Sequence, residues 1–174
     1  MHLLLVTEPI GHIKDAIMFV ADETFSGGLF SSFRSLKLHA ATDEDAEDVI
    51  IHYSQGSGLV ESLKICSSSL TDKGLFNLLD HLSSLQELEL TSCNEITEEG
   101  LNAALPIKLT RLVILDCIHV ADQSVAYLAR NLPCLQYFEI QVIIITEYGI
   151  LSLLLYAQDS RDDEIWILLF AYGS

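Results

Sequence analysis

A pattern of leucines that repeats along the chain is the feature that most constrains its fold. Residues 85–101, LQELELTSCNEITEEGL, follow the pattern L-x-x-L-x-L-x-x-C-x-x-I-T-x-x-G-L. Four other stretches match it in whole or in part, and the five copies begin at residues 33, 60, 85, 109 and 135. These positions are 27, 25, 24 and 26 residues apart. A period of this length predicts a solenoid, in which each unit packs only against its neighbours.

The spacing of apolar residues changes halfway through each copy. Leu88 and Leu90 alternate with polar residues, which is the period of a strand with one buried face. After the turn the spacing becomes i, i+3, i+4 and i+7, one face of a helix. The copy that begins at residue 60 shows it most clearly: Leu75, Leu78, Leu79 and Leu82. We therefore predict one parallel sheet with a helix after each strand, the strands lying near Leu36, Leu63, Leu88, Leu112 and Phe138.

A threonine followed by an acidic residue marks three of the predicted helix starts: Thr71-Asp72, Thr97-Glu98 and Thr146-Glu147. A threonine hydroxyl at the N-cap accepts a hydrogen bond from a first-turn amide, and the acid favours the positive end of the helix. In the copy that begins at residue 109, Ala121 replaces the threonine. We expect either that Asp122 caps that helix or that its start is weaker by roughly 1 kcal/mol.

The C-x-x-I-T-x-x-G-L turn resembles the cysteine-containing leucine-rich repeat of the F-box/leucine-rich-repeat proteins and their F-box-free relatives. The resemblance covers about residues 29–156 and is specific at residues 85–101 and 109–132. It implies an α/β fold, a right-handed leucine-rich-repeat solenoid with a parallel concave sheet and convex helices. It also implies protein binding. Members with an F-box are substrate receptors of SCF-type, cullin-RING ubiquitin ligases, and they dock on the adaptor Skp1 for ubiquitin-dependent protein catabolism.

The resemblance divides the chain into three parts. Residues 1–28 are predicted as an N-terminal segment with a candidate helical cap at residues 13–21, and residues 29–156 as about five repeats. No F-box with its Leu-Pro opening is recognised before the repeats, so Skp1 and cullin are expected as partners only if an F-box is supplied elsewhere. Residues 157–174 read as an acidic linker and an apolar tail.

The apolar tail is expected either to fold back as an irregular cap over the repeat that begins at Leu135 or to leave that edge open for self-association. An uncovered solenoid end exposes an unpaired strand edge and the apolar side of a repeat to water. Five large apolar side chains are available to cover it: Ile165, Trp166, Leu168, Leu169 and Phe170.

The four cysteines are interpreted as reduced thiols. Cys93 and Cys117 are one period apart and are predicted to be buried neighbours, roughly 5 Å apart by the strand spacing. No C-x-x-C pair occurs, so we expect no metal site. Their separation is compatible with a disulfide, but no secretion signal is recognised and a reducing compartment, cytoplasm or nucleus, is expected. Cys66 is expected to point outward and to react with thiol reagents.

Sequence motifs and charge limit the function classes. H-E-x-x-H, G-x-S-x-G and P-loop motifs are absent, so we expect no enzyme and no cofactor, with a thiol enzyme or hydrolase as the remote alternative. Nine basic and 25 acidic residues give a net charge of −16, which disfavours nucleic acid and anionic membranes as partners. The acidic clusters at residues 43–48 and 159–164 are interpreted as solvated surface, with cation binding as the alternative.

The strand positions between the buried leucines are the candidate protein-binding surface on the concave face. Val113 and Leu115 are apolar where polar side chains are expected, and Arg111 and Tyr137 flank them, a composition typical of a binding hot spot. Ordinary scattered aliphatics, or a terminal segment that covers them, are the alternative. The predicted function is a non-catalytic protein interaction module that resembles the substrate-binding leucine-rich-repeat part of an SCF-type ubiquitin ligase receptor. The alternative is an F-box-free adaptor or scaffold without a link to ubiquitin ligase. The candidate residues are Glu87, Glu89, Arg111, Val113, Leu115, Tyr137 and Glu139.

Overall fold

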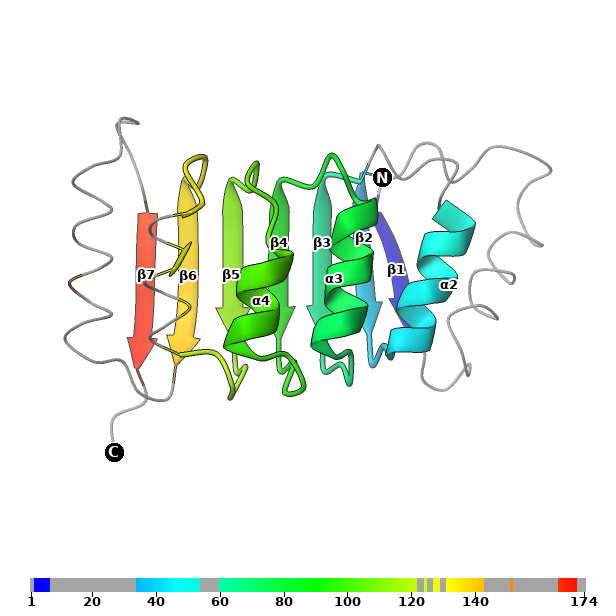
Figure 1. Cartoon of the computed structure of the whole chain (residues 1–174), viewed down its shortest axis with the longest axis horizontal. Helices are drawn as coiled ribbons and strands as arrows, with labels where there is room; N and C mark the ends of the chain where they lie inside the picture. Colours follow the sequence, from blue (N-terminus) through cyan, green and yellow to red (C-terminus); the bar gives the residue numbers. More distant parts are fainter. Residues whose placement is uncertain are drawn as a thin grey trace.

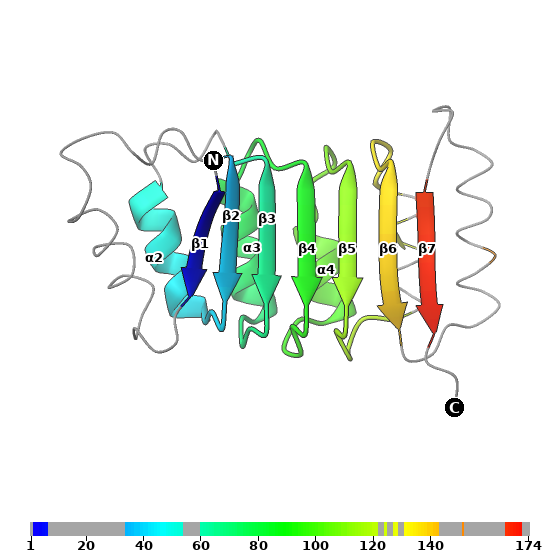
Figure 2. The same ribbon diagram turned by 180° about the vertical axis from the view of Figure 1, so that it is seen from behind.

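The described strands form a single parallel sheet with helices along one face. The computed structural model describes residues 2–6, 34–53, 60–121, 124, 127–128, 131–142, 151 and 166–171. Seven strands lie side by side in chain order, β1 to β7, and each is parallel to the next. Helices α2, α3 and α4 lie on one face (Figure 1), and the opposite face carries no described helix (Figure 2). The fold is thus a solenoid-like α/β arrangement.

The elements follow one another as strand and helix from β2 to β5. Each described helix lies between two neighbouring strands in the chain, so that the crossovers of α2, α3 and α4 pass over the same face of the sheet (Figure 1). The bounds are β1 (His2–Val6), β2 (Ser35–His39), α2 (Asp43–Tyr53), β3 (Ser62–Cys66), α3 (Asp72–His81), β4 (Glu87–Thr91), α4 (Glu98–Ala104), β5 (Arg111–Leu115), β6 (Tyr137–Val142) and β7 (Trp166–Ala171).

The predicted parallel sheet is confirmed at residue level. The first leucine of each predicted strand pairs in register with the corresponding residue of the next: Leu36, Leu63, Leu88, Leu112 and Phe138. These residues, together with the position two residues further along each strand, are at most 1% exposed. Burying a side chain of this size contributes roughly 1.5 to 3 kcal/mol. The core is therefore a row of apolar layers between the sheet and the helices.

Two strands extend the sheet beyond the predicted five. In β1, Leu3 and Leu5 take the register positions of Leu36 and Leu38. At the other end the tail covers the repeat that begins at Leu135, as expected, because β7 pairs with β6. The expected irregular form and the alternative of an open edge at β6 are wrong, since Trp166–Ala171 is a regular strand. Ile167 of that strand aligns with Phe138. A strand that pairs along β6 satisfies the backbone N–H and C=O groups at that edge. An irregular cap would leave many of these groups without ladder partners. The candidate helix at residues 13–21 lies outside the described residues.

The same turn follows four successive strands. Ala40, Ser67, Ser92 and Asp116, each one residue after its strand, have φ angles between 49° and 55°. The amide of each of the first three still donates to the next strand, as in Ser92 N to Leu115 O at 2.8 Å. The left-handed conformation costs a non-glycine residue roughly 1 to 2 kcal/mol. The continued ladder offsets this strain, and the turn directs the chain toward the helix face.

Acidic residues at the helix starts connect each unit to the next. We call Asp43, Asp72 and Glu98 the carboxylate ladder. The Asp72 carboxylate accepts hydrogen bonds from Thr97 N at 2.8 Å and from Thr97 Oγ1 at 2.7 Å. Asp43 binds Thr71 in the same way, at 2.8 and 2.7 Å. Each carboxylate therefore satisfies a backbone donor that the start of the following helix leaves open.

The threonine caps follow the prediction only in part. Thr97 is confirmed as an N-cap, since its hydroxyl accepts from Gly100 N at 3.2 Å. Thr71 makes no side-chain cap bond, so that part of the prediction is wrong. The Thr71 hydroxyl donates to Asp43 Oδ2 instead. Thr146 lies outside the described residues.

In the unit without a threonine, a carboxylate of the preceding helix binds the backbone at the helix start. Glu98 Oε1 of the preceding helix accepts from Ala121 N at 2.7 Å and from Ser124 N at 3.4 Å. The Glu98 carboxylate thus accepts the first-turn amide hydrogen bond that an N-cap side chain of the same unit would otherwise accept. Asp122, the expected cap, lies outside the described residues.

The carboxylate ladder also accounts for the glycine of the repeat. A Cβ added to Gly100 would lie 1.9 Å from Cγ of Asp72, and one added to Gly74 would lie 2.2 Å from Oδ1 of Asp43. No side chain fits at these distances without displacing the carboxylate. The glycine in T-x-x-G therefore leaves room for the acid of the preceding unit.

We expect Gly100→Ala to destabilise the protein by about 1 to 3 kcal/mol, because the added methyl group displaces the Asp72 carboxylate. Helix propensity alone predicts the opposite sign, since alanine is favoured over glycine by about 1 kcal/mol. Urea denaturation of the wild type and the variant measures the difference. In an Asp72→Gly background, which lacks the carboxylate and also the Cβ that would lie 2.4 Å from the added methyl group, the same substitution is expected to cost much less. Destabilisation of equal size in both backgrounds would contradict this account.

Candidate protein-binding surface

The face of the sheet opposite the described helices, which we call the open face, brings together the predicted binding residues. Alternate residues of β2 to β6 point to it, because successive side chains of a strand point to opposite faces. The register aligns them in rows across the strands, one of which runs Lys37, Lys64, Glu89, Val113 and Glu139. The seven predicted candidates all occupy this face, on the three neighbouring strands β4, β5 and β6. Figure 2 views the sheet from this side.

Arg111, Tyr137 and Glu139 form a connected cluster on the open face. The Arg111 guanidinium carbon lies 3.9 Å from the centroid of the Tyr137 ring, in cation–π contact. The Tyr137 hydroxyl donates to Glu139 Oε2 at 2.7 Å. The hydrogen bond to Glu139 raises the pKa of Tyr137, burial adds to the effect, and Arg111 opposes it. The phenol therefore stays protonated at neutral pH and keeps its donor role.

The side chain of Val113 is less exposed than predicted. Its side chain is only 2% exposed, so the predicted exposed apolar centre is wrong at this residue. In the register it lies between Glu89 of β4 and Glu139 of β6, whose longer side chains flank the short valine on both sides. Leu115 is half-buried and keeps part of its surface in water. The accessible part of the predicted hot spot is therefore Arg111 and Tyr137, with Leu115 beside them.

The predicted thiol accessibilities are right for two cysteines and wrong for a third. Cys93 and Cys117 are buried, and the Sγ atoms donate to strand carbonyls such as Ile65 O at 3.6 Å and Leu115 O at 3.4 Å. A hydrogen bond with Cys117, together with burial, raises the pKa of Cys93. Cys66 is only 8% exposed, and its burial raises its pKa. Cys134 is the exposed thiol.

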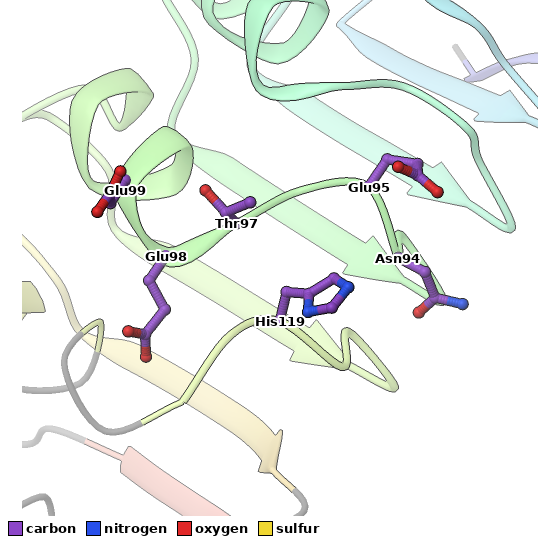
Figure 3. A pocket seen from close by; sticks show the side chains of 6 residues that line it. All are labelled: Asn94, Glu95, Thr97, Glu98, Glu99 and His119. Atoms are coloured by element: carbon purple, nitrogen blue, oxygen red, sulfur yellow. The ribbon is translucent and has the colours of Figure 1, made fainter.

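A depression at the carboxyl ends of strands β4 and β5 lies outside the predicted site. It has a volume of about 490 Å³ and lies where the turns after β4 and β5 meet the start of α4 (Figure 3). Its lining residues are Asn94, Glu95, Thr97, Glu98, Glu99 and His119. His119 comes from a different unit than the others, so only the stacking of units brings it there. Thr97 and Glu98 already serve the carboxylate ladder.

The acidic cluster at residues 43–48 is partly used inside the fold. Asp43 binds Thr71, and Asp45 accepts from Thr42 N at 2.8 Å and from Thr42 Oγ1 at 2.9 Å. These two carboxylates are structural, in contrast to the expected solvated surface. The cluster at residues 159–164 lies outside the described residues. Within the described ranges, no three His, Cys, Asp or Glu side chains are grouped so as to hold a metal ion.

Thiol labelling checks the burial of the cysteines. In the native protein we expect a thiol reagent such as iodoacetamide to modify Cys134 first, because the other described thiols are shielded and Cys66 and Cys93 have raised pKa values. Mass spectrometry of timed digests measures the order. The Cys134→Ser variant serves as control and should lose the fast phase. Fast modification of Cys66 in that variant would contradict the expected order.

Spectrophotometric titration checks the Arg111, Tyr137 and Glu139 cluster. The raised pKa of Tyr137 means that this phenol ionises at higher pH than an ordinary tyrosine, since the phenolate would face the Glu139 carboxylate. Glu139→Gln is therefore expected to move its ionisation to lower pH. Subtracting the curve of Tyr137→Phe isolates the signal of this one residue. An unchanged midpoint in Glu139→Gln would show that the hydrogen bond does not control it.

The open face thus offers cationic, aromatic and carboxylate groups in fixed positions. None of the described helices is long and apolar enough to cross a membrane. The groups suit the recognition of another polypeptide, through stacking on Tyr137 and hydrogen bonds from Arg111.

Compared with known protein families, the chain matches no family model.

Proposed function

We propose that the chain is a non-catalytic protein interaction module whose open face binds a segment of a partner protein. The Arg111, Tyr137 and Glu139 cluster is the observation that carries this proposal. Tyrosine and arginine dominate the energy of protein interfaces. Here the stacking and the hydrogen bond hold both side chains in place before binding, which reduces the entropy lost on association.

We further propose that the fold is a right-handed leucine-rich-repeat solenoid with the open face on its concave side. The proposal is supported by the 24 to 27 residue spacing of the copies. It is also supported by one parallel strand per copy and by helices on a single face. Solenoids of this kind use their extended concave surface for binding.

The resemblance to the F-box/leucine-rich-repeat proteins suggests a specific role. We propose that the chain acts as the substrate-binding part of an SCF-type ubiquitin ligase receptor, in which Skp1 and cullin bind through an F-box supplied elsewhere. The alternative is an F-box-free adaptor or scaffold with no link to ubiquitin ligase. Both roles use the same open face, and they differ in whether Skp1 accompanies the partner.

A thiol enzyme has less support than a binding module. Cys66 is the thiol on the open face, and its burial raises its pKa. A raised pKa lowers the thiolate fraction at neutral pH, whereas catalytic cysteines have lowered values. Its register partners are His39 and Thr91. The arrangement favours packing over nucleophilic attack.

Comparing two tyrosine variants tests the proposed function. Affinity capture with Tyr137→Ala is expected to lose the partner that the wild type retains, with a loss of about 30-fold, or 2 kcal/mol, for a hot-spot residue. Tyr127→Ala is the matched control, because Tyr127 is 38% exposed in the helical segment that follows β5. Thermal unfolding of both variants confirms that they fold.

The outcome of the capture separates the proposals. A partner lost with Tyr137→Ala and kept with Tyr127→Ala supports binding by the open face. A partner kept with both, or lost equally with both, contradicts it. Skp1 and cullin in the captured complex support the receptor role, and a stable partner without Skp1 supports the adaptor.

A further inference from the structure

Three of the chain's few basic residues lie on the open face. Only nine Lys and Arg residues accompany 25 acidic ones, and three of the nine, Lys37, Lys64 and Arg111, lie on β2, β3 and β5 of this face. A fourth, Arg34, directly precedes β2 and pairs with Glu61. In a protein of net charge −16, this concentration makes the β2 and β3 end of the face locally cationic.

Two of these residues are placed against each other. Lys37 and Lys64 are direct register partners on neighbouring parallel strands, roughly 5 Å apart along the sheet. Like charges in this position destabilise a sheet. Lys64 is compensated by an ion pair with Glu89. Among the acidic residues that the structure describes, none forms an ion pair with Lys37.

Charged side chains of three strands affect the Cys66 thiol. Burial raises the pKa of this thiol, Lys64 and Lys37 lower it, and Glu89 adds to the rise. Cys66 follows Lys64 by two residues and is the register partner of His39. Both lysines therefore lie close enough to affect the carboxyl end of β3, where Glu89 partly offsets their charge.

We propose that Lys37 and Lys64 receive a carboxylate side chain from an acidic segment of the protein partner. This inference rests on the proposed binding function of the open face. A carboxylate between the two ammonium groups removes their repulsion and gains two charge-assisted hydrogen bonds. An acidic segment is repelled by the rest of the chain, so this end of the open face selects where it docks.

The probe for this site is a fluorescent hexaglutamate peptide, whose binding is measured by fluorescence anisotropy at low salt. Hexaglutamine tests the need for charge, and a hexamer of thymidylate tests whether nucleic acid is preferred. The variants are Lys37→Gln and Lys64→Gln. Lys108→Gln is the matched control, because it removes the same charge from an exposed turn between α4 and β5.

The site predicts a specific set of results. Hexaglutamate binds the wild type and hexaglutamine does not, and Lys37→Gln weakens binding about tenfold while Lys108→Gln changes it less than about twofold. Lys37→Gln keeps or raises the thermal unfolding midpoint, because it removes a repulsion between neighbouring strands. A residue kept only for stability would show the opposite change in the midpoint.

Four results would each overturn the inference: no binding of hexaglutamate, an equal loss with Lys108→Gln, a lowered midpoint of Lys37→Gln, or tighter binding of the oligonucleotide. A captured partner that depends on Tyr137 but is unaffected by Lys37→Gln also overturns it, and leaves the proposed function standing. Lysine-dependent hexaglutamate binding, beside a captured partner that does not depend on Tyr137, supports the lysine site and counts against the proposed hot spot.

Discussion

The structure depends on the fact that no unit can bury its own apolar face. Each strand and helix supplies one layer of leucines, which is shielded only when neighbouring units stack against it, so the buried row runs from Leu36 to Phe138. The carboxylate ladder sets how closely the units stack. Asp43 and Asp72 each bind the threonine of the next unit, and Gly74 and Gly100 leave the space for them. Hydrophobic burial thus drives the stacking, and directional hydrogen bonds fix its register.

Stacking also determines what is available for function. One face of every strand packs into the core. The residues on the other face do not have to be apolar, and they align in rows across the sheet. Arg111 and Tyr137 hold each other on β5 and β6, and Lys37 and Lys64 oppose each other on β2 and β3. The first contact orders side chains at little cost to stability. The second retains a repulsion that packing does not require, which is why we assign it to binding.

Features that depend on residues close in the sequence were predictable, whereas features that depend on contacts between units were not. The strands near Leu63 and Leu88, the cap at Thr97 and the burial of Cys93 were predictable, since they depend on the local period. Val113 and Cys66 were predicted to be exposed and are buried. Their exposure depends on the side chains of both neighbouring strands, which lie about 24 to 27 residues away in the sequence. The strand β7 was missed because its apolar residues lack the turn motif of the other copies.

The sequence by itself determined the repeat, the parallel order of the five central strands and the identity of the residues that alternate toward the open face. A strict period fixes these features, because each unit repeats the same local preferences. Only the tertiary structure decided which polar side chains bind between units and which strand residues are shielded. The capping of Ala121 by Glu98, the shielding of Val113 and the ion pair of Lys64 with Glu89 are contacts across stacked units. They depend on the closeness and register of stacking, which side chains of different repeats set together.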